Sequence, residues 1–220
     1  MQIQTVGIIG AGTMGNGIAQ ACATSGINVV MVDIAEAAVQ KGLATVAGSL
    51  DRLIKKEKIS AADKEAALAK IKVSTDYSAL KAAQLVIEAA TENEALKIKI
   101  LQEVDALVGP EVLIASNTSS ISITKLAAVT GRADKFIGMH FFNPVPMMAL
   151  VEVIRGLQTS DATHAAVQAL AQQLGKTPIT VKNGPGFVVN RVLIPMINEA
   201  FFVLAEGLAT AEDIDAGMKL

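Results

Sequence analysis

The sequence has 220 residues, of which 51% are hydrophobic and 3% aromatic, and its formal net charge is −2. This length suits one large domain, or one domain and part of another, and provides enough apolar residues for a substantial core. The charge balance and the absence of tryptophan argue against nucleic acid or an anionic membrane as a partner. One cysteine, Cys22, excludes an internal disulfide, and no apolar run reaches membrane-spanning length, so we expect a cytoplasmic protein.

Short β-branched runs alternate with longer helical patterns along the chain. The strand candidates are "TVGIIG", "NVVMVD", "QLVIEAA", "EVLIASN", "FIGMHFF", "LVEVI" and "TPITVK". Helix-length segments separate most of them. This alternation predicts an α/β fold, with a mainly parallel, doubly wound sheet of the Rossmann type and helices on both faces.

The first strand leads into a glycine-rich turn in which Gly10, Gly12 and Gly15 have the spacing G-x-G-x-x-G. A strand before this turn and a helix after it are the context that the dinucleotide-binding fingerprint requires. The first glycine permits the tight turn, the second lets the backbone approach a pyrophosphate, and the third lets helix and strand pack closely. We therefore predict a cofactor-binding loop that includes the intervening residues Thr13 and Met14.

The second strand ends at Asp33, where the fingerprint expects an acidic residue about 20 positions after the glycines. A carboxylate there accepts hydrogen bonds from both ribose hydroxyls and repels a 2′-phosphate. Because no arginine follows nearby to offset that repulsion, the sequence favours NAD over NADP. The alternative is a glycine-rich turn that binds no ligand.

Residues 34–83 show a helical pattern with no apolar strand run. Within them, Ser60 and Asp63 have the spacing of a capping box, which predicts the start of a second helix. We expect a helical hairpin that projects from the sheet, with the basic run "RLIKKEK", residues 52–58, on its first arm. This run is either a solvated helix face or a docking surface for a phosphate-bearing ligand.

Polar residues follow two central strands, at the edge where doubly wound sheets bind their ligands. Glu92 follows one of these strands, and Asn117 and Ser119 follow the next. We assign Asn117 and Ser119 to the ligand site, with helix capping as the alternative. For Ser122 and Thr124 we prefer capping.

One of the two histidines, His140, lies in the apolar stretch "GMHFFNPVPMMALVEV". If "NPVP" forms a turn, His140 and Glu152 become cross-strand neighbours in an antiparallel pair. A buried carboxylate is costly alone but compensated beside an imidazole. We predict that His140 is the general base of a hydride-transfer site and that Glu152 orients it. The alternative is a core histidine bonded to a structural glutamate, and we expect no catalytic role for His164.

The Gly/Pro cluster "NGPGF" interrupts the chain after the last strand candidate. We place a domain boundary there, between a dinucleotide-binding domain at 1–184 and the beginning of a helical domain at 185–220. The helical pattern from Phe187 to Leu208 is apolar on several faces and must be buried against something. It packs either on another subunit or on a C-terminal part that this sequence lacks.

Five segments, "GIIGAGTMGNGIAQ", "IEAATEN", "ASNTSSISI", "GMHFFNPVPMMALVEV" and "GPGFVVNRV", together resemble the 3-hydroxyacyl-CoA dehydrogenase family over essentially the whole chain. The resemblance implies oxidation of an (S)-3-hydroxyacyl-CoA to the 3-ketoacyl-CoA with NAD, and the reverse reduction. Its likeness to bacterial short-chain members implies 3-hydroxybutyryl-CoA as the substrate.

The resemblance also implies roles for individual residues. His140 matches the family's catalytic base, and Glu152 matches the carboxylate that partners it. Ser119 matches a serine that hydrogen-bonds the substrate oxygen, and Asn190 matches an asparagine that completes the site. Asp33 matches the ribose-binding carboxylate. The residues that match the nicotinamide half of the cofactor site are Glu92, Lys97, Asn117 and Asn143. Those that match coenzyme A contacts on the hairpin are Ser49 and Lys56.

Members of this family usually extend further at the C-terminus, where they complete a helical domain that forms much of the dimer interface. We therefore expect a shortened form that keeps NAD binding, and a homodimer for the complete chain. Two alternatives remain open. One is a Rossmann dehydrogenase for a small hydroxy acid, which would not need the basic hairpin. The other is a non-catalytic protein that binds NAD or coenzyme A on the same fold.

Overall fold

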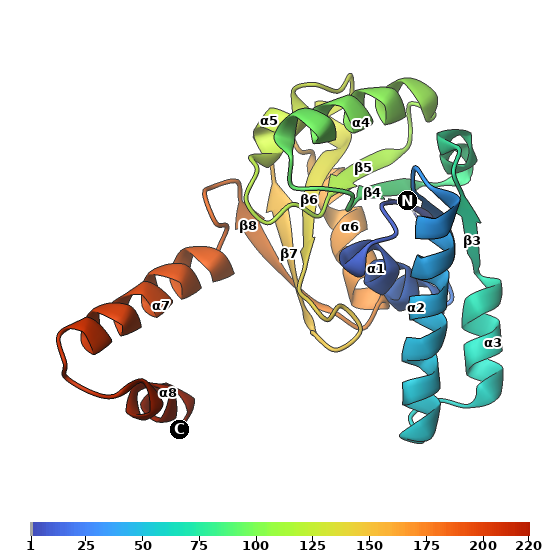
Figure 1. Ribbon diagram of the computed structural model, residues 1–220. Coiled ribbons are helices and arrows are strands. Elements are labelled where there is room, and N and C mark those ends of the chain that lie inside the picture. The colour runs from blue at the N-terminus through green and yellow to red at the C-terminus, as the bar shows by residue number, and fades with distance from the viewer. Residues whose placement is uncertain (1) are drawn as a thin grey trace.

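The computed structural model describes residues 2–220, and its strands form one eight-stranded sheet (Figure 1). The strands are β1 (Thr5–Ile9), β2 (Asn28–Val32), β3 (Ile71–Ser74), β4 (Leu85–Glu88), β5 (Leu113–Ser116), β6 (Phe136–Phe141), β7 (Leu150–Arg155) and β8 (Thr177–Lys182). Their order is β3-β2-β1-β4-β5-β6-β7-β8, and β6 and β7 are the antiparallel pair in an otherwise parallel sheet. The predicted doubly wound architecture is confirmed.

Helices cover both faces of the sheet (Figure 1). They are α1 (Thr13–Thr24), α2 (Glu36–Lys55), α3 (Ala61–Ala69), α4 (Glu94–Leu107), α5 (Ile123–Ala127), α6 (Asp161–Gln173), α7 (Val189–Ala205) and α8 (Ala211–Lys219), with 3-10 turns at Tyr77–Ala82 and Ala133–Lys135. Alternate residues of β4 point to opposite faces, so Leu85 and Ile87 join an apolar cluster with α1, α2 and α6, whereas Val86 joins one with α4 and α5. Burial on both faces explains why the strands read as continuous apolar runs.

The expectation of a purely helical connection across residues 34–83 was wrong in one element. Strand β3 lies within it, at the edge of the sheet, and pairs in parallel with β2. Its sequence "IKVS" offers only Ile71 and Val73 as apolar residues, too few for a recognisable strand pattern. The predicted hairpin is nevertheless present: α2 and α3 run side by side, with their connection away from the sheet (Figure 1).

Side-chain caps begin both the second arm of the hairpin and the last helix. At the start of α3, Asp63 N donates to Ser60 Oγ at 3.1 Å and Ser60 N donates to Asp63 Oδ2 at 2.8 Å, which completes the predicted capping box. At the start of α8, Asp213 N donates to Thr210 Oγ1 at 3.2 Å. Both helices therefore begin where side-chain oxygens satisfy their first N–H groups.

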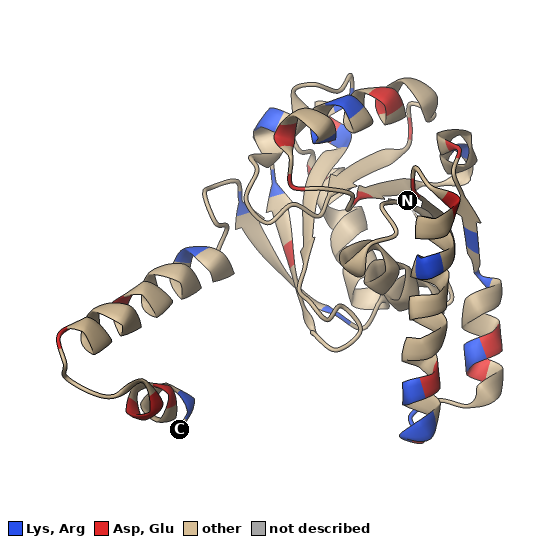
Figure 2. Ribbon diagram, in the orientation of Figure 1, with Lys and Arg blue, Asp and Glu red and all other residues tan. Residues whose placement is uncertain are grey.

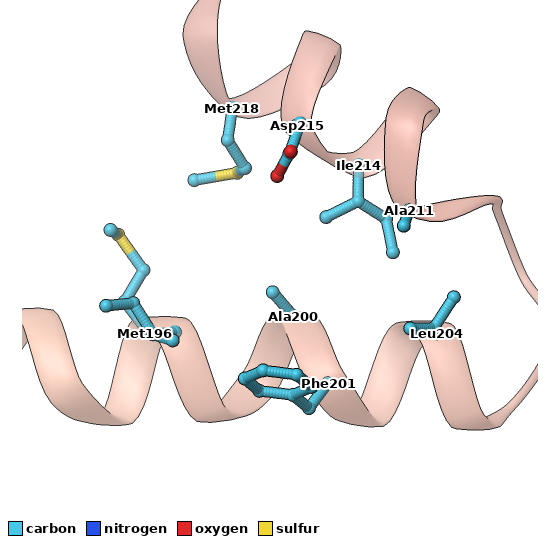
Figure 3. A pocket seen from close by; sticks show the side chains of 9 residues that line it. Met196, Ala200, Phe201, Leu204, Ala211, Ile214, Asp215 and Met218 are labelled. Carbon is cyan, nitrogen blue, oxygen red and sulfur yellow. The ribbon is translucent and has the colours of Figure 1, made fainter.

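Helices α7 and α8 extend away from the sheet at the end of the chain (Figure 1). Every residue of α7 that the structure describes remains at least partly exposed, although the helix is strongly apolar. Figure 3 shows side chains of α7, among them Met196 and Phe201, facing Ile214 and Met218 of α8 across an apolar pocket. Within residues 2–220, no helix combines the length and apolarity needed to span a membrane.

Candidate active site

The three fingerprint glycines serve different purposes in the turn between β1 and α1. Gly10 has a left-handed φ of 99°, and a Cβ there would lie 2.7 Å from the carbonyl oxygen of Ala89. A Cβ at Gly15 would lie 1.7 Å from the carbonyl oxygen of Gly10. A Cβ at Gly12 would meet no atom of the described chain within 4 Å. The fold itself therefore requires the first and third glycines, whereas the second leaves open space in front of the backbone.

The N-terminus of α1 is open to an anion. Gly12 is its N-cap and provides no side-chain acceptor for the N–H groups of the first turn. The first turn also lacks an acidic residue that would occupy the positive end of the helix dipole. Free N–H groups beside the space in front of Gly12 fit the pyrophosphate of a dinucleotide.

Asp33 lies directly after β2 and fixes this loop. Its Oδ2 accepts the N–H of Ala11 at 2.8 Å, and its Oδ1 accepts the N–H of Ile34 at 2.8 Å. A carboxylate has about four acceptor positions, so two hydrogen bonds leave capacity for the hydroxyls of a ribose. The residue is only partly buried, as a ligand-binding carboxylate must be.

A crevice opens where the strand order reverses between β1 and β4, the position at which doubly wound sheets bind ligands. It is lined by Gly12, Thr13, Met14, Ala89, Ala90, Thr91, Glu92, Lys97 and Asn117. Six of these are among the predicted cofactor residues. The structure thus brings the glycine loop together with the predicted residues of the β4–α4 and β5–α5 connections.

Behind this crevice lies a buried ion pair that sequence reasoning missed. Lys97 Nζ donates to Glu88 Oε2 at 2.5 Å, and the side chains are 1% and 0% exposed. Ser116 Oγ donates to the same oxygen at 2.8 Å. The sequence signal was available: Glu88 is a single carboxylate within an apolar strand, the same pattern that pointed to Glu152.

His140 and Glu152 are directly opposed in the antiparallel pair β6–β7, as predicted. The distance from His140 Nδ1 to Glu152 Oε2 is 2.7 Å, and the two side chains are 8% and 0% exposed. Because a carboxylate only accepts hydrogen bonds, Nδ1 carries the proton in this contact and Nε2 is left as the acceptor. The pair therefore has the arrangement of an oriented general base.

Aromatic rings surround the imidazole of His140. The ring centroid of Phe142 lies 4.5 Å away and that of Phe187 lies 5.7 Å away. Phe187 adopts a left-handed φ of 53° at the end of the "NGPGF" turn. These apolar neighbours shield the imidazole, so that its side chain is only 8% exposed.

The connection between β5 and α5 lies beside the His140–Glu152 pair. It also lines the cofactor crevice and a second pocket. Asn117 Oδ1 accepts the N–H of Phe141 at 2.9 Å, next to His140. Glu92 accepts the N–H of Ser119 at 3.1 Å. Ser119 and Asn190 line a second pocket, whose other residues are Ser120, Gly186, Arg191, Ile194 and Pro195. The structure thereby brings Ser119 and Asn190 together from distant parts of the sequence.

The last three predicted site residues, Asn143, Ser49 and Lys56, also lie outside the linings of these pockets. Asn143 is exposed in the turn after β6. Ser49 is partly buried near the end of α2, and Lys56 is exposed at its C-cap. Figure 2 shows a concentration of Lys and Arg at this end of the hairpin. Their predicted roles in binding cofactor or coenzyme A remain predictions.

The predictions for the remaining polar residues have mixed outcomes. Ser122 caps α5 by accepting the N–H of Lys125 at 3.3 Å, as predicted. Capping was wrong for Thr124, which lies inside α5 and accepts the N–H of Leu157 at 3.0 Å. His164 bonds Thr180 Oγ1 at 2.9 Å on the surface of α6. Burial and the nearby Arg155 lower the pKa of His164.

Comparison with known proteins places the whole chain in one family. A family model described as "3-hydroxyacyl-CoA dehydrogenase, NAD binding domain" matches residues 5–184, and one described as "3-hydroxyacyl-CoA dehydrogenase, C-terminal domain" matches residues 186–220. The 3-hydroxybutyryl-CoA dehydrogenase of Bradyrhizobium diazoefficiens is 48% identical over 99% of this chain and 74% of its own length. The probable 3-hydroxybutyryl-CoA dehydrogenase of Bacillus subtilis is 46% identical over 100% and 77%.

Solved structures give the same result. The crystal structure of (S)-3-hydroxybutyryl-CoA dehydrogenase from Ralstonia eutropha matches with a TM-score of 0.98 and 76% identity, and the match covers 100% of this chain and 77% of that one. The chain therefore spans about three-quarters of the length of these relatives. The cofactor is NAD, as the match to the NAD-binding model and the position of Asp33 both indicate. The chain belongs to the 3-hydroxyacyl-CoA dehydrogenase family.

Proposed function

We propose that this protein oxidises (S)-3-hydroxybutyryl-CoA to acetoacetyl-CoA with NAD and catalyses the reverse reduction with NADH. The observation that supports this most directly is the His140–Glu152 pair, held at 2.7 Å on strands next to the crevice that fits the cofactor. The family membership supports an acyl-CoA substrate, and the names of the relatives support a four-carbon acyl group.

Bound NAD would supply the acceptor for the hydride that leaves the carbinol carbon of the substrate. His140 Nε2 takes the hydroxyl proton, because its other ring nitrogen already donates to Glu152. The carboxylate of Glu152 keeps the imidazole in that orientation and compensates the positive charge that the ring gains. In the reverse direction, the same nitrogen returns the proton to the developing alkoxide.

Ser119 and Asn190 complete the site in this proposal. Both line the pocket at the start of α7, and each has a side chain that can donate a hydrogen bond to an oxygen atom. We assign Ser119 to the reacting oxygen of the substrate and Asn190 to closing the site from α7. Hydrogen bonds of this type stabilise charge that develops on oxygen during the reaction.

Coenzyme A binds, in this proposal, along the α2–α3 hairpin. Lys55, Lys56 and Lys58 are exposed at its tip, and Ser49 lies about two turns earlier on α2. Exposed ammonium groups attract phosphates, and a hydroxyl can donate to them. The ligand of the basic run is then coenzyme A. A dehydrogenase for a free hydroxy acid would not need such a run.

We also propose that residues 1–184 form the cofactor unit and that residues 185–220 begin the unit for substrate binding and dimerisation. The exposed apolar surface of α7, which includes Val192 and Phe201, supports a homodimer for chains with the full length of the relatives. We expect the enzyme in the cytoplasm, where its buried free thiol, Cys22, would stay reduced.

The test follows NADH absorbance after acetoacetyl-CoA is added to the purified 220-residue protein. An enzyme-dependent fall that is absent with free acetoacetate supports the proposal. Equal rates with both substrates would indicate a dehydrogenase for small hydroxy acids. If NADH binds in a calorimetric titration and no oxoacid or oxoacyl-CoA is turned over, the chain acts as a non-catalytic dinucleotide-binding protein.

A further inference from the structure

The carboxylate of Glu88 occupies a site built from three elements. Oε1 accepts the N–H of Ala90 at 2.9 Å in the loop after β4. Oε2 accepts Lys97 Nζ from α4 at 2.5 Å and the hydroxyl of Ser116 from β5 at 2.8 Å. Glu88 is 0% exposed, so these donors replace all the water that an ionised carboxylate would otherwise bind.

Lys97 connects this buried carboxylate to the cofactor crevice. Its side chain is 1% exposed, yet the residue lines the crevice together with Glu92 and Asn117. An ammonium group has three donors, and Glu88 is the one acceptor assigned to Lys97 in residues 2–220. Within residues 2–220 no acceptor is assigned to the other two donors, and they remain for a ligand in the crevice that Lys97 lines.

The position of Lys97 identifies which half of the cofactor it faces. Asp33 follows β2 and marks the adenosine end, and the N-terminus of α1 marks the pyrophosphate. The rest of the dinucleotide must then extend across β4 and β5 toward His140, where the hydride is exchanged. Lys97 and Asn117 lie on this side of the crevice.

We propose that Glu88 is a positioning residue that neutralises the buried ammonium of Lys97 and so allows the site to bind the oxidised as well as the reduced nicotinamide. This inference rests on the proposed function. The nicotinamide of NAD⁺ has a positive charge, and that of NADH has none. An uncompensated ammonium in the wall would repel NAD⁺ selectively, whereas a Glu88–Lys97 pair presents no net charge.

The test compares the dissociation constants of NAD⁺ and NADH in calorimetric titrations of the 220-residue protein. In Glu88→Gln, which keeps the shape of the side chain and removes its charge, we expect the ratio Kd(NAD⁺)/Kd(NADH) to rise on the order of tenfold. Changing Lys97→Met in addition should return the ratio to within about twofold of the wild type, because both charges are then absent.

Ser116→Ala is the matched control, since it removes a hydrogen bond to the same oxygen without changing a charge. A structural role for Glu88 would weaken both cofactors equally in Glu88→Gln and leave the ratio unchanged, and this result would overturn the inference. If Glu88→Gln does not fold, Lys97→Met alone decides. The unpaired Glu88 carboxylate should then lower the ratio, and an unchanged or higher ratio would contradict the charge argument. Wild-type protein that binds neither cofactor would overturn the proposed function as well.

Discussion

Glu152 accepts the backbone N–H of Val188 at 3.0 Å, and through this contact the N-terminus of α7 holds the partner of His140. The same oxygen accepts the N–H of Val189, also at 3.0 Å, while the other oxygen bonds the imidazole. Glu152 is 0% exposed, so every one of its partners is part of the protein. The general base is therefore oriented by the junction between the sheet and the C-terminal helices.

This relationship predicts the effect of Glu152→Gln. The amide nitrogen of glutamine donates and cannot accept. Facing His140 it would favour the tautomer with the proton on Nε2, which then cannot act as the base, and facing Val188 it would leave that N–H without its acceptor. We expect kcat for acetoacetyl-CoA reduction to fall by about 10²-fold or more, with a smaller change in KM. Steady-state kinetics measures both constants.

His140→Gln provides the comparison for this variant. We expect a loss of similar or greater size, about 10²–10⁴-fold in kcat, with NADH binding retained in a calorimetric titration. A Glu152→Gln protein with unchanged kcat would show that the pair is structural rather than catalytic.

The glycine turn predicts two different outcomes for two neighbouring substitutions. Gly12→Ala adds a methyl group where no described atom lies within 4 Å, so the protein should fold with an unchanged Tm. Gly15→Ala places the methyl group 1.7 Å from the carbonyl oxygen of Gly10, so it should destabilise the protein by at least about 2 kcal/mol. Thermal unfolding without ligand separates the two variants.

The effect of Gly12→Ala should appear in cofactor binding and not in stability. In Gly12→Ala the new methyl group fills the space through which a pyrophosphate approaches, and we expect the Kd for NADH to rise at least about tenfold. If Gly12→Ala instead bound NADH normally, the pyrophosphate would not lie at this turn.

The sequence predicted the site better where the signal was local. The cross-strand contact of His140 and Glu152 followed from their equal distances from Pro146, because residues at equal distances from the centre of a turn pair in register. The link from Glu152 to Val188 could not be predicted, since it depends on where the "NGPGF" turn places α7. Strand β3 was missed because four residues with two apolar side chains are defined by their pairing with β2 and not by their own pattern.

The basic hairpin tip predicts a charge effect on substrate binding. In Lys56→Glu, repulsion of the coenzyme A phosphates should raise KM for acetoacetyl-CoA about tenfold, with little change in kcat. The effect should weaken as ionic strength rises above about 0.15 M, because Lys56 is exposed. Lys41→Glu makes the same charge change at an exposed position earlier on α2 and should leave KM unchanged. Equal effects of the two variants would mean that only the overall charge matters.

Burial predicts the chemical behaviour of the single cysteine. Cys22 is completely buried in α1 among apolar residues, and desolvation raises the pKa of its thiol to about 12. Because the thiolate is the reactive form, the folded protein should show almost no reaction with a thiol reagent at about pH 8. In denaturant the thiol returns to its ordinary pKa of about 8.5, and one thiol per chain should react.

Addition of NADH should slow any remaining reaction of Cys22 in the folded protein. Helix α1 begins at the cofactor loop, and a ligand that binds only the folded state suppresses the opening of that state. Rapid labelling of the folded protein would contradict the packing of α1 against the sheet.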